Sequence, residues 1–137
     1  MKVILDTNVF VSGVFFSGPP NQILKRWRDG SLTLVLSADI FNEYCRVATI
    51  IAEQFPTINL QKILGFVEKE ADFYDVPALS EQVCDDSDDD KFLACALASE
   101  TKIIVSGDKH LLRVSGYRDV EVCKPKAFVD TYSTVVF

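Results

Sequence analysis

Acidic residues gather at three places along the 137-residue chain where they could support chemistry. Asp6 directly follows an apolar run, Asp108 follows another, and five aspartates lie among the six residues from Asp85 to Asp90. Carboxylates that converge on one pocket repel one another unless a cation shares the site or some of them stay protonated. Oxygen ligands of this kind suit Mg²⁺ or Mn²⁺ and not zinc. Because such ions activate water for attack on phosphate, the pattern predicts metal-dependent phosphodiester hydrolysis.

Each of these acidic residues also fits a purely structural role. Asp6 could cap the turn after its strand, and Asp108 could cap a short helix. The segment 87–90 matches a capping box, in which the third residue after a serine folds back to the cap. Glu43 lies at the margin of the apolar face of a predicted helix and could simply be solvated. Taken together, their positions at strand ends and at a helix start favour a metal site.

Other catalytic chemistries find little support in the sequence. His110 is the only histidine, and no serine or cysteine nucleophile stands in a recognisable context such as GxSxG. We therefore expect His110 to pack or to lie beside a phosphate. Glycine-rich loops that cradle nucleotide phosphates are not found either.

Composition restricts how the chain could hold a nucleic acid. Acidic residues outnumber basic ones 20 to 14, which gives a net charge of −6. A protein that grips nucleic acid through a basic surface is not expected at this charge, so a metal ion would have to neutralise the phosphate.

The chain length predicts a single domain over residues 1–137. Its four cysteines are far apart and contain no CxxC pair, which predicts neither a zinc knuckle nor a disulfide framework. Reduced core thiols predict a cytoplasmic protein. No stretch approaches the roughly 20 apolar residues that a membrane-spanning helix needs, so no membrane partner is expected.

Apolar periodicity predicts strands that alternate with helices. The predicted strands are Lys2–Leu5, Leu32–Leu36, Phe73–Val76, Ile103–Ser106 and Val120–Cys123. The predicted helices are Asn21–Arg28, one from a cap at Ser37 to Ile51, Leu60–Ala71, Lys91–Ser99, Lys109–Leu112 and Lys126–Tyr132, whereas Ser12–Pro20 is predicted to be a loop. This alternation is typical of an α/β domain with a mainly parallel sheet. Active sites of such sheets lie beyond the carboxyl ends of the strands, where the acidic residues are expected.

Three segments, in this order, resemble the PIN-domain nucleases: "ILDTNVFVS", "DDDKFLACALA" and "IIVSGDKHLL". The similarity covers nearly the whole chain and is greatest to short prokaryotic PIN proteins described as toxin components of toxin–antitoxin pairs. It implies a three-layer fold with a five-stranded, mainly parallel sheet flanked by helices. It also implies an endoribonuclease that depends on Mg²⁺ or Mn²⁺.

The resemblance assigns roles residue by residue. Metal-binding and catalytic roles fall on Asp6, Glu43, Asp90 and Asp108, with Asn8 and Ser106 in support. Periodicity does not choose between Asp89 and Asp90, and only the D-x-x-hydrophobic-Ala motif selects Asp90. Glu43 is assigned from its position on the helix after the second strand.

The partners implied by the resemblance are an RNA substrate, a cognate antitoxin and further copies of the chain in a homodimer or higher homo-oligomer. The main alternative is a catalytically inactive PIN-like interaction module, against which the filled acidic positions argue. A phosphatase on a doubly wound sheet would need D-x-D where Asp6 and Asn8 stand. A receiver would need an aspartate directly after the third strand, where Val76 and Pro77 stand.

Overall fold

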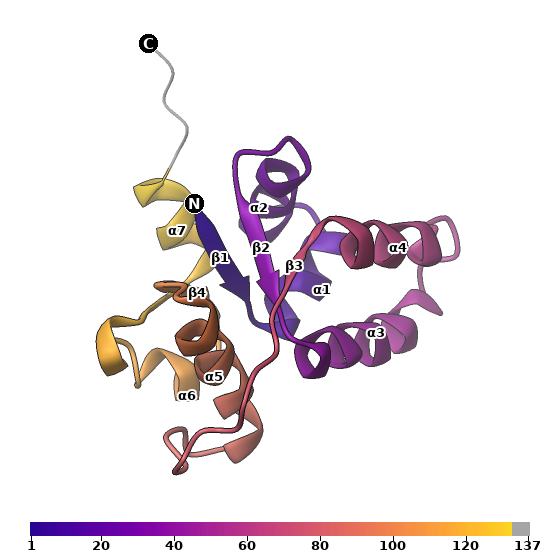
Figure 1. Ribbon diagram of the computed structural model, residues 1–137. Helices are drawn as coiled ribbons and strands as arrows, with labels where there is room; N and C mark the ends of the chain where they lie inside the picture. Colours follow the sequence, from indigo (N-terminus) through magenta and orange to yellow (C-terminus); the bar gives the residue numbers. More distant parts are fainter. Residues whose placement is uncertain (133–137) are drawn as a thin grey trace.

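A five-stranded sheet in which all neighbouring strands are parallel forms the centre of the molecule (Figure 1). It is seen in a computed structural model that describes residues 1–132. The strands are β1 (Lys2–Leu5), β2 (Thr33–Leu36), β3 (Asp72–Phe73), β4 (Ile103–Val105) and β5 (Glu121–Cys123), in the order β3-β2-β1-β4-β5. The predicted α/β fold is confirmed.

Helices flank this sheet on the connections between strands and after β5. They are α1 (Thr7–Phe15), α2 (Pro19–Arg28), α3 (Ala38–Ala52), α4 (Leu60–Glu70), α5 (Asp90–Ser99), α6 (Lys109–Leu112) and α7 (Pro125–Thr131), with short 3₁₀ turns η1 (Ser87–Asp89) and η2 (Tyr117–Asp119). The predicted bounds agree closely except in two places. The third strand is shorter than predicted because its neighbour β2 ends at Leu36. The N–H of Tyr74 donates to the carbonyl of Leu36, and beyond this bond β3 has no strand residue of β2 left to pair with.

The second difference is α1, which occupies a segment whose second half was predicted to be a loop. Gly13 and the prolines that follow it are typical of a loop, yet here Gly13 serves helix packing. A Cβ atom at Gly13 would lie 2.6 Å from Leu24 Cδ1 and 2.9 Å from the backbone oxygen of Pro20. The glycine therefore permits a close approach of α1 to α2.

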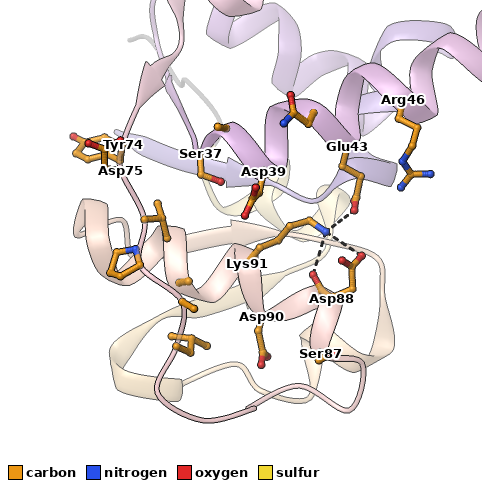
Figure 2. A pocket seen from close by; sticks show the side chains of 17 residues that line it. Ser37, Asp39, Glu43, Arg46, Tyr74, Asp75, Ser87, Asp88, Asp90 and Lys91 are labelled. Atoms are coloured by element: carbon orange, nitrogen blue, oxygen red, sulfur yellow. Dashed lines mark hydrogen bonds and ion pairs between the residues drawn. The ribbon is translucent and has the colours of Figure 1, made fainter.

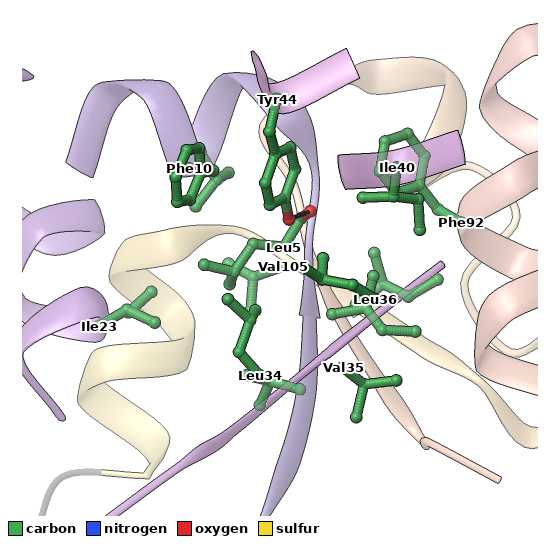
Figure 3. Packing of buried hydrophobic residues seen from close by; sticks show 14 of the residues in the cluster. Leu5, Phe10, Ile23, Leu34, Val35, Leu36, Ile40, Tyr44, Phe92 and Val105 are labelled. Carbon is green, nitrogen blue, oxygen red and sulfur yellow. Dashed lines mark hydrogen bonds between the residues drawn. The ribbon is translucent and has the colours of Figure 1, made fainter. Parts of the chain in front are cut away.

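The core fixes the end of β1 from one side (Figure 3). Phe10 of α1 and Tyr44 of α3 are fully buried, and their rings stack with centroids 4.2 Å apart. The Tyr44 hydroxyl donates a hydrogen bond to the backbone carbonyl of Leu5, the last residue of β1. On the other side, the N–H of Asp6 donates to the carbonyl of Val105 at 3.0 Å. The backbone that carries Asp6 is thereby held by a helix and by the neighbouring strand.

The winding of the sheet reverses between β1 and β4. The chain runs outward from β1 through β2 to β3, and then returns to β4 and continues to β5 on the opposite edge. In open α/β sheets, ligand sites lie beyond the carboxyl ends of the strands at such a reversal. In Figure 1 the long connection from β3 to α5 passes at the end to which the arrows of β1 and β2 point. Residues that follow β1 and β4 therefore meet the acidic segment at one edge.

In the described part of the chain, no helix combines the length and the apolar character needed to cross a membrane.

Substitution of Gly13 by alanine is expected to destabilise the fold by about 1–3 kcal/mol, because the added methyl group would collide with a backbone atom of α2. Gly65 lies in the exposed middle of α4, where a methyl group in place of its hydrogen would have nothing within 4 Å. Gly65→Ala should therefore stabilise by ~0.5–1 kcal/mol. Urea unfolding of both variants measures the difference. Equal stabilities would show that α1 and α2 do not pack as described.

Candidate functional site

Asp6 is a buried carboxylate directly after β1, beside the end of β4. Asp6 is 6% exposed. It occupies the N-cap position of α1, but its side chain makes no capping hydrogen bond. Instead, Asp6 Oδ2 accepts a hydrogen bond from the Ser106 hydroxyl at 2.6 Å. The capping role considered for Asp6 is therefore not the one that its side chain performs.

Ser106 links Asp6 to Asp108. Its hydroxyl oxygen, fully buried at the end of β4, also accepts the backbone N–H of Asp108 at 2.9 Å. Asp108 caps α6, since its Oδ1 accepts the N–H of His110 at 2.7 Å. This confirms the structural reading of Asp108, but the cap uses only one of its two carboxylate oxygens. The resemblance placed Ser106 in a supporting role, and this bridge is a physical reason for it.

The acidic groups at this edge interact through their charges. Burial raises the pKa of Asp6, the Ser106 hydroxyl opposes that rise, and the negative charge of Asp108 adds to it. Burial likewise raises the pKa of Asp89 to about 6, and the charges of Asp108, Asp86 and Asp6 contribute further. Asp6 and Asp89 thus both resist ionisation. A cation placed among them would relieve this repulsion.

Asp90 has a different environment from its neighbour Asp89. Its two oxygens accept the backbone N–H groups of Val83 at 3.0 Å and Cys84 at 2.7 Å. In Figure 2 its side chain points away from the ammonium group of Lys91. Asp90 therefore fastens the acidic loop to the start of α5. Its assignment as a metal ligand remains a prediction, and no side-chain pattern in the sequence signals these backbone donors.

Glu43 lies beside the start of α1, although it comes from α3. Ser37 begins α3 by accepting the N–H of Ile40 at 3.2 Å, so Glu43 falls on the second turn. Glu43 Oε1 accepts a hydrogen bond from the Thr7 hydroxyl. Its Oε2 accepts from the ammonium group of Lys91 at 2.5 Å. The structure brings Glu43 near Asp6, whose pKa it also raises slightly, but protein groups already engage both of its oxygens.

A pocket of about 760 Å³ opens next to these residues, between α3, the segment 74–79 and the start of α5 (Figure 2). Two cations line it: exposed Arg46, and Lys91, whose ammonium group is paired with Glu43 and Asp88. A cavity of this size accommodates a ligand of small-molecule dimensions. Neither cation was singled out from the sequence, because lysine and arginine on a helix are usually solvated.

The remaining candidates, Asn8 and His110, lie near the acidic residues that follow β1 and β4. Asn8 is exposed in the first turn of α1. His110 Nδ1 lies 3.4 Å from a carboxylate oxygen of Asp85 in the acidic loop. Across residues 1–132, no three acidic, histidine or cysteine side chains converge closely enough to hold a metal ion as they stand. The donors have the oxygen chemistry that Mg²⁺ and Mn²⁺ prefer, but they do not form a closed cage.

Comparison with known proteins gives one match. A family model described as "PIN domain" matches residues 2–110, a span that includes Asp6, Glu43, the acidic loop and Asp108. Neither a curated protein nor a solved structure matches the chain.

Asparagine substitutions should separate the roles of Asp89 and Asp90. Asp90→Asn loses an acceptor for a loop N–H and should lower the free energy of unfolding by about 1–3 kcal/mol. Asp89→Asn removes a repelling charge, so it should keep or raise the melting temperature but weaken Mn²⁺ binding by about tenfold or more. Thermal melts and Mn²⁺ titrations of both variants measure these effects. Weaker Mn²⁺ binding with unchanged stability in Asp90→Asn alone would identify Asp90 as the ligand.

The stability of the metal-free protein should depend on pH between about 4 and 6. Because the folded-state pKa of Asp89 is raised from 3.8 to about 6, the native state binds more protons than the unfolded state in this interval. Stability should therefore fall as pH rises through the interval and stay lower at pH 7. Urea midpoints measured across this range with EDTA present test the slope. Asp89→Asn should flatten it, and an unchanged slope in that variant would contradict the assignment.

Proposed function

The chain belongs to the PIN-domain family, and from this premise we propose that it is an endoribonuclease that depends on Mg²⁺ or Mn²⁺. PIN domains are typically nucleases, so a hydrolase that acts on nucleic acid is the general class of activity. The choice of RNA and of the metal is our proposal. The observation that carries it is the buried carboxylate of Asp6, which makes no helix cap and is joined through Ser106 to Asp108.

The ion would be held by Asp6, Asp89 and Asp108. The charges of Asp6 and Asp108 raise the pKa of Asp89, so a cation among the three would be favoured. The oxygen-only donor set fits Mg²⁺ or Mn²⁺. When bound, such an ion supplies neutralisation of the phosphate charge and a water of lowered pKa. The resemblance also assigns Glu43 and Asp90 to the ion, but protein groups engage both oxygens of each of these side chains in this structure.

The chain's own groups would prepare this edge for a phosphodiester. The Ser106 hydroxyl orients the Asp6 carboxylate. Both residues are buried, so little water reaches this hydrogen bond. Tyr44 holds the last carbonyl of β1, which sets where Asp6 begins. Arg46 is exposed on the pocket wall, and its guanidinium would attract a phosphate of the RNA strand. This positive charge is local, and it does not require a basic surface.

The biological role that we propose for this activity is that of the toxin in a toxin–antitoxin pair, neutralised by a cognate antitoxin and assembled as a homodimer or higher homo-oligomer. The three motifs quoted above support this role. Cleavage of RNA would be the toxic reaction, so it should be lost together with toxicity when Asp6 is replaced.

The purified protein should cleave RNA in the presence of Mn²⁺ or Mg²⁺ and stop when EDTA is added. Asp6→Asn should abolish cleavage, because it removes a ligand and a negative charge while keeping the shape. Without metal this variant should melt at or above the temperature of the native protein, since the buried carboxylate resists ionisation. Labelled single-stranded and structured RNAs provide the activity measurement, and thermal melts provide the stability measurement.

Glu53→Gln is the matched control, because it removes one negative charge from the exposed C-terminal end of α3, ten positions beyond Glu43. It should keep full cleavage. Intact RNA with either metal, in protein shown to be folded and free of antitoxin, would favour the inactive interaction module. A lower melting temperature of metal-free Asp6→Asn would show that Asp6 is chiefly structural.

A further inference from the structure

We propose that Lys91 is a built-in cation that takes the place of a second metal ion, so that this edge of the sheet binds one divalent ion. The inference rests on the proposed function, since it concerns how many ions the nuclease site holds. It starts from Figure 2, where the Lys91 ammonium lies between the carboxylates of Glu43 and Asp88.

The ammonium group of Lys91 is fully engaged. It donates to Glu43 Oε2 at 2.5 Å, and it lies 3.0 Å from Asp88 Oδ2 and 3.1 Å from the backbone oxygen of Asp88. An ammonium group has three N–H donors, and each has an oxygen acceptor here. The Lys91 side chain is only 15% exposed, so this arrangement differs from an ordinary solvated surface pair.

Glu43 is engaged to the same extent. One of its oxygens accepts from the Thr7 hydroxyl and the other from Lys91. Its side chain is 16% exposed, so water compensates little for a broken bond. A metal ion bound by Glu43 would have to displace the ammonium and leave it buried near a second positive charge, which is costly.

The placement of Lys91 explains how two groups of carboxylates coexist at one edge. Glu43 and Asp88 lie against Lys91, whereas Asp89 has no such partner and its pKa is raised by burial and by the charges of Asp108 and Asp6. The cation therefore divides the acidic residues into a pair that the protein itself neutralises and a group that remains for a divalent ion. The ion pair also joins α3 to the start of α5 across 48 positions of the chain.

The ammonium charge would oppose a second divalent ion in two ways. It occupies the oxygens that the ion would need, and its positive charge repels any cation that approaches them. Lys91 is accordingly a positioning residue. It holds Glu43 against α1 and sets the number of ions, and it need not touch the RNA.

The test is the number of Mn²⁺ ions bound per chain, measured by isothermal titration calorimetry and by electron paramagnetic resonance of free Mn²⁺. The native protein should bind one ion. Lys91→Met keeps the apolar stem but removes the charge, and it should bind two. Lys91→Met combined with Glu43→Gln should return to one, because the second site then lacks its carboxylate. Thermal melts in EDTA establish that each variant is folded.

Glu43→Gln alone keeps the proposal testable if Lys91→Met does not fold. In the native background it should leave one bound ion with nearly unchanged affinity, whereas a loss of about tenfold or more would overturn the proposal. Two ions in the native protein, or one in folded Lys91→Met, would also overturn it while leaving a metal-dependent nuclease intact. Failure of the native protein to bind any Mn²⁺ would instead refute the proposed function.

Discussion

The burial of one carboxylate at the end of β1 is the constraint around which this site is built. An ionised group removed from water is unfavourable unless hydrogen bonds or a counter-charge compensate. The protein provides the hydroxyl of Ser106 and the backbone of Thr7, and it places other negative charges nearby. The surrounding backbone is held firmly in return: Tyr44 fixes the carbonyl before Asp6, and the N–H of Asp6 itself bonds to β4. A rigid strand end therefore carries a side chain whose charge is poorly compensated, a combination typical of functional sites.

The acidic loop shows how neighbouring residues of one type acquire separate roles. Asp86 accepts the N–H of Asp88 and begins η1, and Asp90 accepts two loop N–H groups. Asp88 pairs with Lys91, which leaves Asp89 as the member whose charge is opposed by other acids. The run of aspartates is thus neither a uniform metal-attracting patch nor a simple capping box. The role of Asp86, Asp88 and Asp90 in this run is set by the hydrogen-bond donor that lies next to each carboxylate.

The sequence was sufficient to predict the sheet, because buried parallel strands appear as short apolar runs that end abruptly. It also singled out Asp6, which directly follows the first run, and Asp108, which stands three positions after the end of β4. It did not reveal α1, because Gly13 has the same signature in a loop as in a tight helix contact. It could not separate Asp89 from Asp90, because one residue of helix rotation decides which carboxylate meets the backbone of Val83 and Cys84. Lys91 was missed for a related reason, since its partner Glu43 is distant in sequence.

The hydrogen bond between Ser106 and Asp6 joins residues that are 100 positions apart. During synthesis from the N-terminus, β1 leaves the ribosome long before β4, and domains fold as units once their parts are present. Until Ser106 emerges, Asp6 has neither its hydroxyl partner nor the strand beside it. Translation of 100 positions therefore separates Asp6 from its hydroxyl partner. A nascent or truncated chain that stops before β4 contains the first acidic motif but not the edge that gives it a function.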